Sequence, residues 1–143
     1  MAMSALGIDT SSSASFRVKP TDLASAISTD PQDEFPSVFA TSGLVTILKI
    51  TSVRVLKPYL EPGQLSVGVT VDVSHTAPTP GDALVTAEAT YKAKEGKRFV
   101  FDVLASNEGA RFGVAVHKRA VVDAQRLLVG AKKRVADSPS QSA

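Results

Sequence analysis

The chain has 143 residues, carries a net charge of +2 and is 43% hydrophobic. This length fits one domain, and this share of apolar side chains supports one core, which excludes a chain that is disordered throughout. No apolar run approaches the ~20 residues of a membrane span, and the first residues lack the pattern of a secretory signal. Cysteine is absent and there are only two histidines. We therefore expect a cytoplasmic protein without disulfides, a bound metal or a membrane contact.

The positive charge is concentrated at the end of the chain. Residues 1–122 carry 12 basic and 12 acidic side chains, so the whole excess lies in residues 123–143. With 6% aromatic residues and no tryptophan, the body offers neither a broad basic face nor platforms on which bases would stack. We expect no nucleic-acid partner.

The first half of the chain predicts one long helix. Residues 1–14 and 137–143 are small and polar and are expected to be disordered, which leaves one domain over residues 15–136. A short strand at 16–19 and a short helix at 21–27 are predicted before a polar loop. The run from 42 to 57 predicts a long, buried helix, because apolar residues recur there at helical spacing: Leu44, Ile47, Leu48 and Val55, with Thr51 on the same stripe.

After Pro58 the period of the pattern changes from 3.6 to 2. Alternate valines at 67, 69, 71 and 73 predict a strand with one apolar face, and His75 shares that face by parity. Three more strands are predicted at 83–91, 99–105 and 112–122, so that the four form an antiparallel meander. A final basic helix is predicted from 123 to 136.

Parity along the last predicted strand sorts its side chains into two faces. Phe112, Val114 and Val116 are expected to face the core. Arg119 is then expected to point outward. His117 is expected to point outward as well, or to lie at a contact between subunits.

These elements favour an α+β fold in which a curved antiparallel sheet wraps one long central helix. A helix of about 16 residues spans ~24 Å, which matches strands of ~9 to 12 residues. The order of strand, short helix, long helix and four strands is that of the hot-dog fold. Sheets of this fold pair edge to edge into dimers, which also protects an exposed edge.

Four segments carry a resemblance to a known family. They are Glu-Phe-Pro-Ser-Val-Phe-Ala-Thr at 34–41, Pro-Tyr-Leu-Glu-Pro-Gly at 58–63, His-Thr-Ala-Pro-Thr-Pro at 75–80 and His-Lys-Arg-Ala-Val at 117–121. Together these segments, over roughly residues 16–125, resemble the fluoroacetyl-CoA thioesterase family of hot-dog proteins. That resemblance implies hydrolysis of an acyl-CoA thioester without a metal or a cofactor other than the CoA of the substrate. It also implies a homodimer, or a tetramer built from two dimers.

The resemblance implies roles for individual residues. Thr41 and His75 take the places of the family's catalytic threonine and histidine, Phe35 that of a phenylalanine near the acyl pocket, and Gly68 that of a glycine beside the acyl group. Lys49 stands where the family has a catalytic glutamate. An ammonium cannot accept a proton as a carboxylate does, so Lys49 acts as a base only if burial lowers its pKa; protonated, it instead holds the thioester carbonyl or a CoA phosphate by charge.

Each candidate also has a plain structural interpretation. His75 is either a general base or a hydrogen-bonded histidine of the core or rim. Thr41 is either catalytic or the N-cap of the long helix. Phe35 and Phe39 either line the substrate pocket or simply fill the core.

Charged candidates have alternatives of the same kind. The ammonium of Lys49 lies either at the active site or in the solvent, which the long aliphatic part of the side chain allows it to reach. Arg119 meets the acidic parts of CoA or a partner chain, or else forms an ordinary surface ion pair.

Two functions follow. The first is an acyl-CoA thioesterase in which His75 activates or orients water and Thr41 positions the thioester or acts as nucleophile, with Lys49 holding charge near the carbonyl. The second is a non-hydrolytic protein that binds acyl-CoA or a small acid, an alternative motivated by Lys49. Hydration or dehydration of an acyl thioester is a weaker third, because no Asp and His pair at the helix start serves to remove an α-proton.

Overall fold

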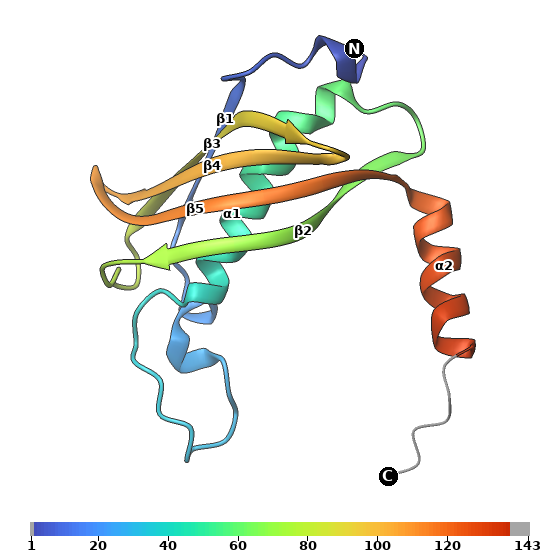
Figure 1. Cartoon of the computed structure of the whole chain (residues 1–143). Helices are drawn as coiled ribbons and strands as arrows, with labels where there is room; N and C mark the ends of the chain where they lie inside the picture. Colours follow the sequence, from blue (N-terminus) through green and yellow to red (C-terminus); the bar gives the residue numbers. More distant parts are fainter. Residues whose placement is uncertain (1, 138–143) are drawn as a thin grey trace.

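A computed structural model describes residues 2–137 of the chain. Five strands form one antiparallel sheet in the order β1-β3-β4-β5-β2, and the sheet curves around a central helix, α1 (Figure 1). The elements are β1 (Ser11–Arg17), α1 (Thr41–Leu56), β2 (Gln64–His75), β3 (Leu84–Glu95), β4 (Arg98–Asn107), β5 (Ala110–Asp123) and α2 (Ala124–Ala136). This architecture confirms the predicted fold class.

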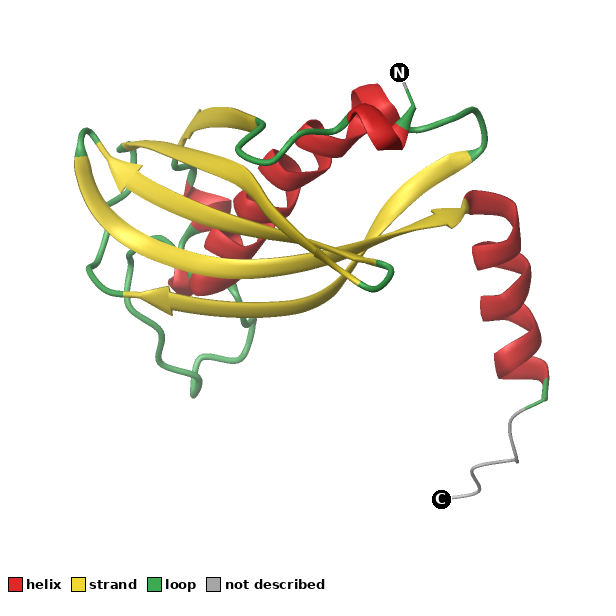
Figure 2. Ribbon diagram, turned by 45° about the horizontal axis from the view of Figure 1, so that its top comes forward, coloured by secondary structure: helices red, strands yellow, loops and turns green. Residues whose placement is uncertain are grey.

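Helix α1 is the centre of the core. It occupies Thr41–Leu56, within one residue of the predicted helix at 42–57, and lies against the concave face of the sheet (Figure 2). Its apolar stripe explains its place, because burial of that stripe against the sheet stabilises both elements. Buried along the stripe are Leu44, Ile47, Leu48, Thr51, Val55 and Leu56.

The predicted four-strand meander is wrong for one strand. Strands β3, β4 and β5 follow one another in the sheet, but β2 pairs with β5 and not with β3. The connection from β2 to β3 is held by the segment before α1, through a bridge between Val38 and Pro80 and a hydrogen bond from Phe39 N to Thr79 O of 2.8 Å. As a result β2 lies at one free edge of the sheet and β1 at the other.

A bulge in β5 reverses the predicted faces of that strand. Gly113 pairs with Ala105 and Arg111 pairs with Ser106, so Phe112 is an extra residue. An extra residue shifts the parity of everything after it. The side chains of His117 and Arg119, predicted to point outward, are therefore buried, with exposed fractions of 0% and 3%.

The valines that were assigned to the core side of β5 lie on the outer face. Val114 and Val116 are 37% and 40% exposed, and the expectation that they face α1 was wrong for the same reason.

Strand β2 has a second bulge. Gly68 pairs with Arg119 and Thr70 with Lys118, which leaves Val69 unpaired. Val67, which was predicted to share the core face, lies opposite Ala120 and so points to the outer side. After the bulge Val73 and His75 face α1 as predicted.

The ends of the chain depart from prediction in detail. Strand β1 begins at Ser11, so residues 11–14 of the segment expected to be loose pair with β3. Two 3-10 turns, Pro20–Asp22 and Ala24–Ala26, replace the predicted short helix. Helix α2 begins where predicted, with Asp123 accepting a hydrogen bond of 2.8 Å from Arg126 N. The predicted loose tail lies outside the described residues from 138 onward.

Helix α2 extends away from the sheet and has no buried residue (Figure 1). No helix in the described part of the chain has both the length and the apolar character to cross a membrane.

Candidate active site

Thr41 and His75, the first residue of α1 and the last residue of β2, meet at one end of the central helix. The distance from Thr41 Oγ1 to His75 Nδ1 is 2.9 Å. Ala40 occupies the N-cap position and no side chain caps the helix there, so the Thr41 hydroxyl is not used for capping. A hydroxyl and an imidazole in this contact form the pair that hydrolytic enzymes use to activate a nucleophile.

His75 is held between aromatic rings and is partly buried. Its ring lies 6.5 Å from that of Phe39 and 5.6 Å from that of Phe112, between ring centroids. Burial lowers the pKa of His75 below 6.5, and hydrogen bonding by the Ala77 backbone opposes the shift only in part. Its Nε2 atom is buried and has no hydrogen-bond partner among the described residues. The ring is therefore neutral near pH 7, as a general base must be.

A mainly apolar cleft of about 520 Å³ adjoins the pair. Thr41 and His75 line it together with Phe35 and Phe39. Phe35 is 46% exposed and is free to contact a ligand, whereas Phe39 is 1% exposed and belongs to the core. Gly43 on α1 leaves room for the Phe39 ring, since a Cβ at that position would lie 2.6 Å from it.

Lys49 is not part of this pair. It lies eight residues after Thr41, about 12 Å further along the helix at 1.5 Å per residue. Its side chain is exposed and not buried. Instead it lies beside Gly68, where a Cβ would be 3.5 Å from Lys49 Cε. Within one chain the structure therefore brings together two of the three predicted catalytic residues.

A second group of polar residues surrounds Gly68, and we call Lys49, Gly68, His117 and Arg119 the cationic cluster. Arg119 Nη1 lies 3.1 Å from His117 Nε2, and a Cβ on Gly68 would lie 3.3 Å from His117 Cε1. Sequence reasoning placed Gly68 and Arg119 as substrate-binding residues but missed His117. The signal that was available is Gly113, because a lone glycine inside a strand indicates a bulge and hence a change of parity.

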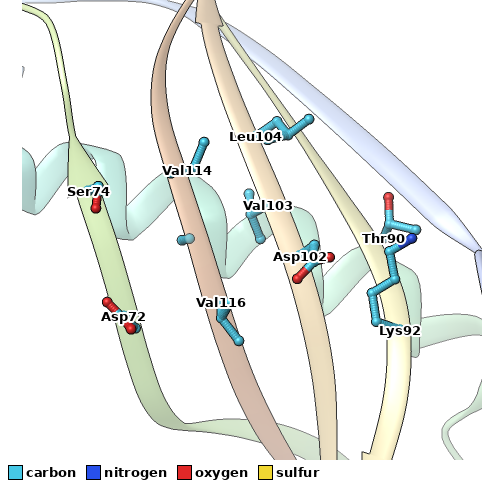
Figure 3. A pocket seen from close by; sticks show the side chains of 10 residues that line it. Asp72, Ser74, Thr90, Lys92, Asp102, Val103, Leu104, Val114 and Val116 are labelled. Atoms are coloured by element: carbon cyan, nitrogen blue, oxygen red, sulfur yellow. The ribbon is translucent and has the colours of Figure 1, made fainter.

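A separate hollow of about 470 Å³ lies on the outer face of the sheet (Figure 3). Asp72, Lys92, Asp102, Val114 and Val116 are among the residues that line it. It contains no imidazole beside a hydroxyl, so it lacks the arrangement found at Thr41 and His75. Residues 2–137 contain no group of three or more potential metal ligands close together.

The fold and the site together define a class of protein. A curved five-strand antiparallel sheet around one helix is the fold of hot-dog proteins, and a hydroxyl in contact with an imidazole beside a cleft is an arrangement that suits hydrolysis.

Comparison with known proteins gives the family. Residues 18–125 match the family described as "Fluoroacetyl-CoA-specific thioesterase", and the chain belongs to it. A fluoroacetyl-CoA thioesterase of Streptantibioticus cattleyicolor is 40% identical over 94 residues, which are 66% of this chain and 68% of that protein.

Solved structures agree. That of the fluoroacetyl-CoA thioesterase FlK superposes with a TM-score of 0.84 at 31% identity and covers 93% of this chain and 98% of its own. A thioesterase superfamily member from Thermus thermophilus has a TM-score of 0.82 at 23% identity, with 95% and 100% of the two chains covered, and shows the shared fold.

Proposed function

We propose that the protein hydrolyses short acyl-CoA thioesters at Thr41 and His75. The observation that carries the proposal is the 2.9 Å contact between Thr41 Oγ1 and His75 Nδ1 beside a cleft, in a member of a thioesterase family. The apolar lining suits a small acyl group, and the neutral imidazole suits proton transfer from water.

Hydrolysis needs one base and a polarised carbonyl. The oxygen of water adds to the thioester carbon as His75 takes a proton, the C–S bond breaks, and the proton passes to the thiolate of CoA. Thr41 has two roles open to it here. It either accepts a hydrogen bond from Nδ1–H and so orients the ring, or donates its proton to Nδ1 and attacks the carbon itself. In the second case the C–S bond breaks, the thiolate of CoA takes the proton from His75, and water then hydrolyses the ester on Thr41 with His75 again as the base.

The proposal includes a homodimer formed through β2. This strand has 12 residues and an unpaired edge, with Val69 and Val71 39% and 38% exposed. A long apolar edge is a template for pairing with another strand. Antiparallel pairing of two β2 strands turns the His75 end of one toward the half of the other that holds Gly68, and so toward the partner's Lys49. The lack of cysteine suits a reducing, cytoplasmic location.

Release of CoA from acetyl-, propionyl-, butyryl- and fluoroacetyl-CoA tests the function. We expect turnover of at least one of them by the wild type. Tight binding by calorimetry with no turnover of any would contradict the proposal and leave a binding protein; a Lys49→Glu variant that gained hydrolysis would strengthen that second interpretation.

Mass spectrometry of the protein quenched during turnover separates the two roles of Thr41. An acyl adduct on Thr41 identifies it as the nucleophile. Turnover without an adduct, and with activity retained in Thr41→Ser, identifies it as the residue that orients His75.

A further inference from the structure

The cationic cluster contains a buried guanidinium that no carboxylate among residues 2–137 neutralises. Arg119 is 3% exposed, and its Nε and Nη2 donate to Ser66 Oγ and Ser66 O at 2.9 and 2.8 Å. With the bond to His117, three of its five N–H groups are used, and one on each terminal nitrogen has no partner among the described residues. A buried charge in this state is costly unless an anion compensates it.

His117 adds no compensating charge. Its Nδ1 donates to the Thr70 carbonyl at 2.9 Å, which leaves Nε2 to accept from Arg119. Burial is the largest cause that lowers the pKa of His117, and the positive charges of Arg119 and Lys49 lower this pKa further. The hydrogen bond to the Thr70 carbonyl opposes the shift only in part. The imidazole is neutral, and its role is to hold the guanidinium.

Lys49 brings a second positive charge to the same place. Among residues 2–137 the ion pairs are Lys92 with Asp9 and Lys118 with Glu95, so neither Lys49 nor Arg119 has an acidic partner there. Gly68 lies between the two: a Cβ there would be in contact with both, at 3.5 Å from Arg119 Nη1 and 3.5 Å from Lys49 Cε, so the absence of a side chain at 68 leaves both cations next to the backbone of β2.

We propose that this cationic cluster binds the carboxylate at the far end of a dicarboxylic acyl group carried by the thioester substrate. A carboxylate accepts two hydrogen bonds from an arginine and an ion pair from a lysine. Arg119 is buried beside the small residue Gly68, a position that suits a compact carboxylate on a short acyl chain better than the bulkier phosphates of CoA.

The proposal rests on the proposed thioesterase function and on the dimer through β2. Within one chain, Lys49 lies about 12 Å along α1 from Thr41, too far for a short acyl group that is being hydrolysed at Thr41 and His75. The proposal therefore requires that the two β2 strands pair in a register that brings the cluster of one chain to the Thr41 and His75 pair of the other. A diacid thioester then has its carbonyl in one chain and its carboxylate in the partner.

Succinyl-CoA and butyryl-CoA test the proposal, because both have four acyl carbons and differ in the terminal carboxylate. We expect the wild-type dimer to hydrolyse succinyl-CoA with a kcat/KM about 10- to 100-fold higher than that for butyryl-CoA, because a hydrogen bond to a charged group contributes a free energy in that range. In Lys49→Met most of that preference disappears, mainly through a higher KM for succinyl-CoA. Lys97→Met is the matched control, because Lys97 is an exposed lysine in the turn between β3 and β4, and it should leave the preference for succinyl-CoA unchanged. Equal turnover of the two thioesters, or an unchanged preference in Lys49→Met, would overturn the proposal.

The same thioesters of pantetheine separate the acyl carboxylate from the phosphates of CoA. We expect the preference for succinyl to persist without the phosphates. If Lys49→Met instead weakens both CoA thioesters equally and neither pantetheine thioester, the cluster binds phosphate and the proposal is wrong.

Calorimetry with free succinate and butyrate makes the result independent of turnover. We expect the wild type and His75→Ala to bind succinate more tightly than butyrate, and Lys49→Met to lose the difference. If no thioester is hydrolysed, the proposed function fails, while this titration still decides the ligand: equal binding of succinate and butyrate by the wild type rejects the carboxylate site.

Discussion

Replacing His75 with alanine should abolish most hydrolysis while leaving the fold intact. His75 Nδ1 is 2.9 Å from Thr41 Oγ1, and removal of the ring takes away the proton acceptor of this pair. Loss of a general base typically lowers the rate by 10²- to 10⁴-fold, which corresponds to about 3 to 5 kcal/mol of transition-state stabilisation. We expect the loss to appear mainly in kcat, since the cleft that holds the acyl group remains.

The stability of the variant provides the control. His75 is partly buried and touches two rings, and each aromatic contact contributes about 0.5 to 1.5 kcal/mol. Removing the ring also removes a buried nitrogen without a partner, which offsets part of that loss. The free energy of unfolding should therefore fall by less than about 3 kcal/mol.

The assay is simple for this protein. Because the chain has no cysteine, a thiol-reactive dye reports only the CoA that is released. An activity of His75→Ala within about threefold of the wild type, in a protein that unfolds cooperatively, would refute the assignment of His75 as the base, since a lost base should lower it at least ~100-fold.

Three further predictions concern pH, the core and the proposed dimer. Because burial lowers the pKa of His75 below 6.5, kcat/KM should stay level from pH 8 to about 6.5 and fall only as the pH drops further; a midpoint above 7 would contradict this. Phe39→Ala should destabilise the protein by about 3 to 5 kcal/mol and lower Tm by roughly 10 °C, whereas Phe35→Ala, at an exposed ring, should leave thermal unfolding nearly unchanged. Val71→Lys on the free edge should give a monomer in sedimentation and lose activity, while Leu84→Lys, equally exposed on another strand, should remain dimeric; a dimeric Val71→Lys would argue against the β2 interface.

The sequence predicts the parts of this fold that depend on local pattern. Helix α1 follows from one apolar stripe with helical spacing, and strands β2 to β5 follow from alternation of period 2, whereas the serine-rich start of β1 carries no such pattern. The pairing of β2 with β5 does not follow from local pattern, because a meander and a crossover place the same residues in strands. What decides it is the packing of the β2 to β3 connection against Val38 and Phe39, a long-range contact.

Bulges explain the residues that were misplaced. One extra residue, Phe112, moves His117 and Arg119 from the expected surface to the interior. The bulges in β5 and β2 each adjoin a glycine within a strand, Gly113 and Gly68, so a weak signal for these two was present in the sequence.

The candidate site was predicted by different means. Local pattern alone interprets Thr41 as a helix cap, and only the resemblance to the family pairs it with His75. The distance between Lys49 and this pair could not be predicted, because it depends on how α1 lies along the sheet.

A double-mutant cycle over Thr41→Val and His75→Ala tests the central claim most directly, with kcat/KM for the best acyl-CoA as the measured quantity. If the hydroxyl and the imidazole act as one unit, the double variant should be no slower than His75→Ala alone. Losses that simply multiply, or a Thr41→Val variant as fast as the wild type, would show that the two groups do not work together and would contradict the account.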